Sequence, residues 1–536
     1  MVGGAIKNDA SLLKKVDIQE YLKRRFIPLR IVGDVLELGV VEGLSQTSIR
    51  YFADKYSLKV KVITISRRFF LRAIQSKFSD LFLKTSTRKL QEKLPVFSAH
   101  KTLSKPQTLV LMLIILVTLK GGVSSLVVWF VVLNLIFLSN TIYKAKLFFQ
   151  GRLPREKTLM HKDQLPTYTI ILPVLKEDLY TIKELLNSIA ELDYPKNKKD
   201  VKLIVEQFDR TTLSSVIEAN LLEEVDVICV KRGAPKTKPK ACNYGLKFAK
   251  GEYLVVYDAE DRPEKGQLKK AVAAFRKGPK KLVCLQASLR FYNKNSNIMT
   301  RLMGVEYRLW FDRFLDALER SRSPIPLGGN SNHFKVQELR KVGGWDSYNV
   351  TEDADLGIRL FKRGYTTQML SSETFEEAPE SLWQFIKQRS RWIKGHLQTY
   401  FVHLRSSKLF FKKGNVFAFI NFNVFLFFSC LGFLYPFVAA VMILFASFVC
   451  GVNTGLICKV SIINMAIGFA FSFYSFYVIA QEEGCDRRWR FLLAFLAPFY
   501  FFLHSIASVV AFVEIFFCPH YWHKTQHNFH NKQHSS

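Results

Sequence analysis

Residues 253–261 read YLVVYDAED, an apolar run that ends in the three carboxylates Asp258, Glu260 and Asp261. Similar short apolar runs occur before and after it, and segments with helical spacing such as LYTIKELLNSIAEL (179–192) separate them. Alternating buried strands and helices are typical of a doubly wound, mostly parallel sheet, in which ligands bind beyond the carboxyl ends of the strands. The other predicted strands are YTIILPV (168–174), VKLIVEQ (201–207), VDVICV (225–230) and LVCLQAS (282–288).

The carboxylates that follow YLVVY indicate metal chemistry. Asp258 and Glu260 are separated by one residue, and such a pair presents the hard oxygen ligands that Mg²⁺ and Mn²⁺ prefer. These ions commonly bind one or two carboxylates together with substrate phosphates. The structural alternative is an ordinary acidic turn, because Asp is frequent where strands end.

Two further acidic clusters occur where the sheet should expose its carboxyl edge. LIVEQFD places Glu206 and Asp209 after a strand, and VTEDADLGIRL places Glu352, Asp353 and Asp355 at a predicted helix start. Threonine followed by acids is also an N-cap signature. That role does not exclude catalysis, since a carboxylate at such a position can accept a proton from a hydroxyl as general base.

A basic segment, WQFIKQRSRWIKGHLQTY (383–400), precedes the apolar C-terminal region. It places Gln388, Arg389, Arg391 and Trp392 on neighbouring faces of one predicted helix. Taken alone, these residues are as typical of a basic surface helix with an interfacial tryptophan as they are of a binding site.

The composition predicts a mixed membrane and soluble protein. Hydrophobic residues make up 49% of the 536 residues and 47 are Phe, yet the mean hydropathy is only slightly positive. The net charge of +32 suits nucleic acid, anionic lipid or phosphorylated substrates. Cytoplasmic Lys and Arg beside membrane spans explain it most simply, and no nucleic-acid motif is present. Eight cysteines without CxxC spacing indicate buried thiols in a reducing compartment.

The N-terminus lacks an apolar signal-peptide core. Beyond this, we expect six regions along the chain. Residues 106–143 are apolar except for Lys120, which precedes Gly121-Gly122, and form a predicted transmembrane hairpin. The regions are a small N-terminal α/β regulatory or docking domain (1–100), this hairpin, a catalytic domain (150–395), an interfacial amphipathic segment (396–415), transmembrane helices (416–517) and a polar tail (518–536).

The number of spans within 416–517 is open at this stage. Pro436 marks either a kink in one long segment or a tight turn between two, so three or four spans fit the apolar runs.

Several motifs occur in a fixed order: ILPVLKED, VEQFD, KPKACNYGL, VVYDAEDRP, LGGNSNHF, GGWD, TEDADLG and QRSRW. Over residues 165–395 this set resembles the processive family 2 glycosyltransferases, the cellulose, hyaluronan and chitin synthase group. The resemblance implies a GT-A fold between transmembrane helices and an Mg²⁺ or Mn²⁺ cofactor. It also implies a nucleotide-diphosphate sugar donor such as UDP-glucose or UDP-GlcNAc, and a growing β-linked glycan.

The resemblance implies roles for the residues of the donor site. Asp209 matches the aspartate that contacts the nucleotide base, and Glu177 lies near the acid of the family's first donor motif. Lys240 matches a lysine near the donor phosphates. Asp258 and Glu260 match the DxD pair, with Asp258 near the nucleotide and Glu260 toward the metal.

Two departures from the family pattern affect these assignments. Lys176 and Asp178 flank Glu177 where the family usually has Asn-Glu. Asp261 follows Glu260 directly, so Asp261 is a second candidate for the metal ligand.

The resemblance implies further roles at the reacting centre. Asp353, with Glu352 beside it, matches the general base of the TED motif. Gln388, Arg389, Arg391 and Trp392 match QxxRW, which holds the donor diphosphate and the acceptor terminus. The guanidinium of Arg391 would neutralise the charge on the leaving diphosphate, and the face of Trp392 would support a pyranose ring.

The two ends of the chain resemble other modules. WHKTQH (522–527) resembles the W-x-K/R-T gating motif of related synthases through Trp522, Lys524 and Thr525. This favours a cytoplasmic tail and therefore four spans in 416–517, whereas a histidine metal site in the tail is a weaker alternative. The first 100 residues resemble the N-terminal domain of type II secretion and pilus ATPases, through FIPLRIVGDVLELGVV and ITISRRFFLRAIQSKF. Some such domains bind cyclic di-GMP, although these residues contain no clear nucleotide motif.

The sequence therefore predicts a multi-pass protein of the bacterial inner membrane with a cytoplasmic catalytic domain. Its expected function is inverting polymerisation, and export, of a β-linked polysaccharide. The expected partners are the donor, the glycan and the bilayer, with cyclic di-GMP or an export protein as further candidates and no nucleic acid. Two alternatives remain: transfer of one sugar to a lipid or short acceptor, and a catalytically degenerate membrane scaffold or signal receptor.

Overall fold

A computed structural model describes residues 9–43, 45–151, 165–219, 225–411, 416–449 and 455–521. The chain divides into two units. The first comprises Met1–Lys89, Gln164–Asn187 and Tyr194–Ala259, and the second comprises Leu90–Asp163, Ser188–Asp193 and Glu260–Ser536. The N-terminal region is therefore grouped with part of the expected catalytic domain.

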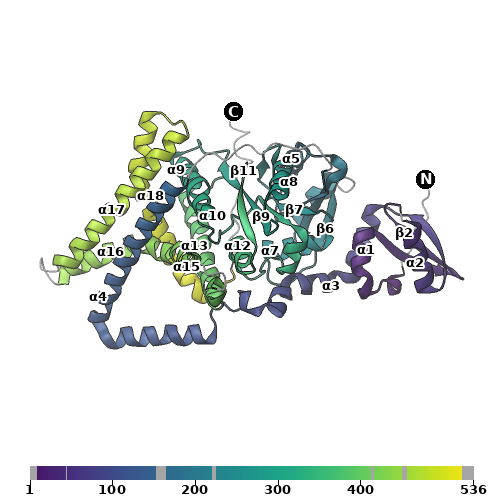
Figure 1. Cartoon of the computed structure of the whole chain (residues 1–536), viewed down its shortest axis with the longest axis horizontal. Helices are drawn as coiled ribbons and strands as arrows, with labels where there is room; N and C mark the ends of the chain where they lie inside the picture. The colour runs from purple at the N-terminus through teal and green to yellow at the C-terminus, as the bar shows by residue number, and fades with distance from the viewer. Residues whose placement is uncertain are drawn as a thin grey trace. The chain divides into compact units, whose positions relative to one another are not determined.

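The N-terminal part of the first unit is a three-stranded sheet with helices (Figure 1). The strands pair in the order β1-β2-β3, with β1 and β2 antiparallel and β2 and β3 parallel. The α/β character expected for this region is present. The elements are α1 (Ile18–Arg24), β1 (Phe26–Val32), β2 (Val35–Val40), α2 (Gln46–Tyr56), β3 (Lys59–Thr64) and α3 (Arg67–Lys93).

The rest of the first unit contains four parallel strands in the order β6-β5-β4-β7. Their side chains are almost all buried, which is why these strands read as continuous apolar runs rather than alternating ones. The elements are β4 (Tyr168–Val174), α5 (Leu179–Ala190), β5 (Lys199–Glu206), α6 (Arg210–Glu218), β6 (Asp226–Val230), α7 (Lys238–Phe248) and β7 (Tyr253–Val256).

The second unit contains strands in the order β10-β9-β11-β8. Strand β9 pairs parallel with β11, whereas β10 and β8 are antiparallel to their neighbours. The elements are β8 (Arg262–Pro263), α8 (Gln267–Lys277), β9 (Leu282–Phe291), α9 (Ile298–Arg308), a π-helix (Leu309–Leu315), α10 (Asp316–Arg320), β10 (Asn332–Lys335), α11 (Val336–Lys341), α12 (Glu352–Lys362) and β11 (Thr366–Glu376).

The strands of the two units make a mixed, mostly parallel set, which confirms the predicted GT-A-like fold class. Strands β8, β10 and β11 were not predicted. Strand β11 reads TTQMLSSETFE, and its polar side chains hide it from an analysis based on apolar runs.

Helices dominate the remainder of the second unit. They are α13 (Leu382–Leu404), α14 (Lys408–Phe411), α15 (Val416–Phe422), a π-helix (Asn423–Phe428), α16 (Ser429–Val449), α17 (Gly455–Glu482) and α18 (Arg487–Phe517). Helices α17 and α18 run side by side (Figure 1). Residues 397–403, expected in an interfacial segment, are mostly a buried continuation of α13.

Four helices in the described part of the chain are long and apolar enough to cross a membrane. Three of them lie within 416–517, and Pro436 lies inside α16 rather than in a turn. The expectation of four spans in this region is therefore wrong for the described residues, because the proline is accommodated within one helix. The candidate spans are Lys105–Gln150, Val416–Leu444, Gly455–Glu482 and Arg487–Phe517.

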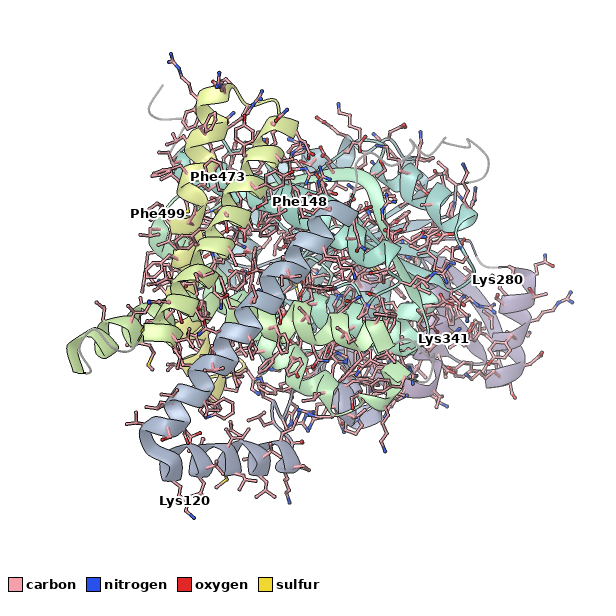
Figure 2. The ribbon with its side chains drawn as sticks, turned by 60° about the vertical axis from the view of Figure 1, so that its left-hand side comes forward. Lys120, Phe148, Lys280, Lys341, Phe473 and Phe499 are labelled. Carbon is pink, nitrogen blue, oxygen red and sulfur yellow. The ribbon has the colours of Figure 1, made fainter. Side chains whose placement is uncertain are left out.

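Helix α4 (Lys105–Gln150) is broken at the glycine pair that the sequence marks. Gly122 has φ 53° and ψ −135°, a conformation that only glycine adopts without strain. The break separates two apolar arms (Figure 1), and the Trp129 Nε1 group of one arm donates to Thr118 Oγ1 of the other at 2.8 Å. Figure 2 shows Lys120 at the corner, where its side chain points away from the rest of the unit.

Candidate functional site

Asp209 lies in the first unit, where β5 ends and α6 begins. Its carboxylate caps α6 by accepting hydrogen bonds from Thr212 N (3.3 Å) and Thr212 Oγ1 (2.6 Å). It also accepts a hydrogen bond from Lys176 N in the loop after β4, and the neighbouring Glu177 N donates to Thr212 Oγ1 at 2.9 Å. The two predicted donor-site residues Asp209 and Glu177 thus meet at the carboxyl ends of adjacent parallel strands, where ligands bind in such folds.

Lys240 is fully buried in the first turns of α7. Its ammonium group lies 2.8 Å from a carboxylate oxygen of Glu206 and donates to the carbonyl oxygen of Gly233 at 3.0 Å. Burial raises the pKa of Glu206, and the ammonium of Lys240 opposes this shift. Lys240 therefore holds the end of β5 against the loop that precedes α7.

Lys238 was not singled out from the sequence, although it lies within the KPKACNYGL motif. It donates to Asp258 Oδ2 at 2.7 Å, and the side chains of Lys238 and Asp258 are 17% and 26% exposed. Of the two lysines in this turn, the partly exposed Lys238 is the one that an anion from solvent can reach. The N-terminus of α7 adds the partial positive charge of the helix dipole.

In the second unit, Asp261 is buried with 1% of its surface exposed. Asn330, from the LGGNSNHF motif, donates through Nδ2 to Asp261 Oδ1 at 2.9 Å and to Glu376 Oε2 at 3.0 Å. Glu376 lies at the end of β11. Asn330 thus joins an acid of the DAED segment to an acid that sequence reasoning missed, because Glu376 follows no apolar run.

Asp353 lies against the same loop. A Cβ built on Gly329 would be 3.6 Å from Asp353 Oδ2, an ordinary van der Waals distance, so position 329 lies beside this carboxylate. The other oxygen, Asp353 Oδ1, accepts from Ala354 N at 2.8 Å in the first turn of α12. Gly329 therefore lies near Asp353 while Asn330 bonds to Asp261, which brings two predicted site residues of the second unit to one loop.

The QxxRW helix α13 is attached to the loop before Asp353. A Cβ on Gly395 would lie 2.3 Å from Thr351 Cγ2, so the side chain of Thr351 packs directly against the backbone of α13. Val350 N donates to Gln398 Oε1 at 3.0 Å, and Asn349 Nδ2 donates to Thr399 Oγ1 at 2.9 Å. The two motifs recognised separately in the sequence are thus neighbours in the fold.

Arg389 is committed to a buried carboxylate that the sequence did not reveal. Its guanidinium lies 2.5 Å from Glu306 of α9, and its central carbon lies 4.2 Å from the ring centroid of Trp392. Tyr500 Oη, on α18, also donates to Glu306, and His504 Nε2 lies 3.2 Å from it. Burial alone would raise the pKa of Glu306, but Arg389 and then His504 lower it to about 2.

The remaining members of the motif differ in exposure. Gln388 is buried, whereas Arg391 and Trp392 are partly exposed. The ring of Trp392 lies 6.2 Å from that of Tyr307. Arg391 and Trp392 are therefore the members of QxxRW that a ligand can reach, and the guanidinium of Arg389 packs against the ring of Trp392.

Glu352 and Asp355 flank the predicted base but point into the protein, since both are buried. Asp355 lies 2.8 Å from Arg359 and 2.9 Å from His403 Nε2. Burial opposes the shift, yet Arg359 and His403 lower the pKa of Asp355. Asp355 therefore anchors α12, whereas Asp353 is the partly exposed acid of this cluster.

The C-terminal end of α18 is docked on α13. Lys394 Nζ lies 2.7 Å from Glu514 and donates to Tyr521 O at 2.9 Å. His520 Nδ1 lies 3.0 Å from Tyr348 O, close to the TED motif. The predicted gating residues Trp522, Lys524 and Thr525 lie outside the described residues.

The side chains present fit an Mg²⁺ or Mn²⁺ ion that arrives with a diphosphate. Across the described ranges no group of three or more His, Cys, Asp or Glu side chains forms a ready metal site. However, Mg²⁺ in phosphate-transfer sites uses only one or two carboxylates. In the second unit, the buried Asn330 Oδ1 has no hydrogen-bond partner among the described residues, and the Nδ2 group of the same amide donates to the carboxylate of Asp261. Asn330 Oδ1 and the Asp261 carboxylate are hard oxygen donors of the kind that these ions prefer.

Comparison with known proteins identifies the domain. Residues 253–518 match the family described as glycosyl transferase family group 2. The chain carries a family 2 glycosyltransferase domain. This match covers the DAED, TED and QRSRW segments, and it confirms that the protein is a glycosyltransferase, as the motifs predict.

Two relatives are similar to part of the chain. A probable glycosyltransferase, YdaM, of Bacillus subtilis is 25% identical over 295 residues, which cover 54% of this chain and 68% of that protein. The beta-monoglucosyldiacylglycerol synthase of a Nostoc species is 28% identical over 256 residues, covering 46% of this chain and 52% of that protein. Among solved structures, the mannosyltransferase PcManGT of Pyrobaculum calidifontis, in complex with GDP-Man and Mn²⁺, aligns with 70% of this chain and 99% of its own at a TM-score of 0.45 and 17% identity.

Proposed function

We propose that this protein is a membrane-embedded, inverting glycosyltransferase that extends a β-linked glycan from a nucleotide-diphosphate sugar. The observation that carries the proposal is the loop of Gly329 and Asn330, which lies beside Asp353 and donates a hydrogen bond to Asp261. A candidate base and a candidate donor-site acid thus lie within the reach of one substrate. The intact set of acids also argues against a catalytically degenerate scaffold or receptor.

Asp353 acts as general base. It accepts the proton of an acceptor hydroxyl, and the resulting oxygen forms a bond to C1 of the donor sugar as the bond from C1 to the diphosphate oxygen breaks. Attack from the face opposite the diphosphate inverts the configuration, and the nucleoside diphosphate leaves with the electron pair. Positive charge builds on the sugar ring in such transfers, and a base in this role contributes about 10²–10⁴-fold.

In the first unit, Lys238 and the N-terminus of α7 would attract the donor diphosphate. As the resemblance implies, the guanidinium of Arg391 would neutralise the charge that develops on a leaving group. In the second unit, Asp261 and Asn330 would hold the divalent ion, with Glu260 as a further candidate. When bound, the ion supplies Lewis-acid stabilisation of the diphosphate.

Two observations bear on the acceptor. The QxxRW helix, docked on the candidate span α18 through Lys394 and Glu306, supports a glycan that grows beside the membrane. The name of the Nostoc relative, a glucosyldiacylglycerol synthase, favours a second candidate, transfer of one sugar to a lipid. Both acceptors would offer a hydroxyl to the same base.

The contacts within each unit constrain how the chain crosses a membrane. Arg25 lies 3.1 Å from Asp226, yet α4 stands between these residues in the sequence, so both ends of α4 must be on one side. Helix α4 then crosses an even number of times, which its two arms allow. Lys394 donates to Tyr521 O, so the two ends of region 416–517 must also lie on one side of the membrane. An even number of crossings is therefore required, and we propose that two of the three long helices of this region cross. We place the catalytic domain on the cytoplasmic side of a bacterial inner membrane, because nucleotide sugars are made in the cytoplasm. An export partner and cyclic di-GMP remain predictions.

The test is product analysis with purified protein. Detergent-purified protein is incubated with Mg²⁺ or Mn²⁺ and with radiolabelled UDP-glucose, UDP-GlcNAc or GDP-mannose, with and without diacylglycerol. Label in a polymer that β-linkage-specific hydrolases digest supports polymerisation, and label in the organic phase supports lipid glucosylation. No transfer from any donor, with folded protein, would contradict both.

A further inference from the structure

Helix α3 packs against α7, the helix that carries Lys238 and Lys240. The ring of Phe82 lies edge-on to Tyr244, with centroids 5.6 Å apart, and to Phe248 at 5.3 Å. Phe82 and both of its partners are buried. An aromatic cluster of this kind fixes relative orientation as well as burying area, so α3 determines where α7 lies.

A second contact joins α3 to the middle of α7. Asn243 Nδ2 donates to Ser86 O of α3 at 3.1 Å. A Cβ on Gly233 would lie 2.7 Å from Leu83 Cδ2, so α3 also presses on the loop whose carbonyl accepts from Lys240. Helix α3 therefore touches both the lysine-bearing helix and the loop that holds one of its lysines.

Helix α3 also covers the edge strand β6. Cys229 N of β6 donates to Gln75 Oε1 at 2.8 Å, which satisfies a backbone group on an open sheet edge. Arg67, at the start of α3, pairs with Asp226 at the start of the same strand. The helix is thus held along the strand rather than at one point.

A buried cluster of charges fixes the N-terminal region to this edge. Arg25 lies 3.1 Å from Asp226 and 3.6 Å from Asp200. Lys202 lies between the same two acids, 2.6 Å from Asp200, and Lys202 and both acids are almost completely buried. Buried charges are tolerated only when paired, so the N-terminal region and the strands form one rigid assembly.

We propose that α3 is a positioning element for the nucleotide-sugar donor, and that Phe82 is its positioning residue. The inference rests on the proposed function, in which the phosphates bind at the N-terminus of α7. Moving α7 moves Lys238, Lys240 and the helix dipole together. A misplacement of about 1 Å costs up to about 10²-fold at a binding or reacting centre. The N-terminal region thereby acts on donor affinity without touching the donor.

The experiment compares Phe82→Ala with Phe70→Ala in the full-length, detergent-purified protein. Both phenylalanines are buried in α3, at 3% and 2% exposure, but they are 12 residues apart, about 18 Å along the helix. Exposed Lys84→Ala is the surface control. The readouts are KM and kcat for the donor that the wild type uses, the binding of UDP and GDP, and thermal unfolding.

We expect Phe82→Ala to raise the donor KM about tenfold and weaken nucleotide binding equally, with kcat within about twofold. Phe70→Ala should lower the unfolding temperature similarly while leaving KM unchanged, and Phe82→Leu should restore most of the affinity. A lower kcat at unchanged KM, or equal effects at Phe82 and Phe70, would overturn the inference. Should Phe82→Ala fail to fold, Asn243→Ala must raise KM in its place.

These outcomes separate the inference from the proposed function. If the wild type transfers sugar and Asp353→Asn does not, yet Phe82→Ala behaves like Phe70→Ala, only the inference about α3 falls. If the folded wild type neither binds UDP or GDP nor transfers sugar, the proposed function fails and the inference falls with it.

Discussion

The carboxylate of Glu306 should raise the free energy of unfolding by about 3 kcal/mol. It is 17% exposed and pairs with Arg389, Tyr500 and His504. Its pKa is lowered from 4.5 to about 2, and 1.36 kcal/mol per pKa unit converts this difference to roughly 3 kcal/mol. Removing one partner of a buried ion pair costs about 3–5 kcal/mol, because the other charge is left unpaired. The value obtained from the pKa and the value expected for breaking a buried ion pair therefore agree.

The perturbation is Glu306→Gln, which keeps the shape of the side chain and removes its charge. Thermal unfolding in detergent should shift down by roughly 5 °C, and transfer activity should fall because Arg389 no longer supports Trp392. The matched control is Glu338→Gln, since Glu338 pairs at 3.6 Å with a largely exposed Lys341 and such surface pairs contribute about 0–1 kcal/mol.

The pH dependence has a definite sign. A carboxylate whose pKa is lowered on folding stabilises the protein above its unfolded pKa of 4.5, and this stabilisation is lost as the pH falls toward 2. The loss caused by Glu306→Gln should therefore be the same at pH 6 and pH 8. An unfolding temperature within about 1 °C of the wild type, which is the precision of such assays, would refute the reasoning.

Three further predictions concern the base, a buried acid and the membrane. Asp353→Asn should lower transfer by about 10²–10⁴-fold at unchanged unfolding temperature; wild-type activity would exclude this residue as base. Burial and a neighbouring carboxylate raise the pKa of Asp346 above its usual 3.8, so its folded form loses stability as the pH rises. Asp346→Asn should gain more stability at pH 8 than at pH 5, measured by thermal unfolding, and an equal change at both would contradict this. In a cysteine-free background, an impermeant maleimide should label Lys84→Cys and Tyr521→Cys from one side and Lys120→Cys from the other; labelling of all three from one side would show that α4 does not cross.

The sequence was sufficient where local chemistry decides the outcome. The parallel strands β4, β5 and β7 are buried on both faces and therefore read largely as apolar runs, and the glycine pair at 121–122 marks the break in α4. The ordered motifs along the chain were enough to predict a glycosyltransferase, because together they resemble the family 2 pattern. Strand β11 escaped because its burial comes from neighbouring strands rather than from its own composition.

The pairing partner of each charged residue could not be predicted from the sequence. Arg389 and Arg391 lie two residues apart in one motif, yet Arg389 faces Glu306, a residue 83 positions away, whereas Arg391 stays partly exposed. Similarly, Lys240 is committed to Glu206 and Lys238 to Asp258. The linear chain determined the fold class, the apolar helices and the set of acids, because these follow from periodicity and residue type. Only the tertiary structure decided which of these groups form structural ion pairs. The reason is that pairing energies depend on distance and burial between segments that are far apart in sequence.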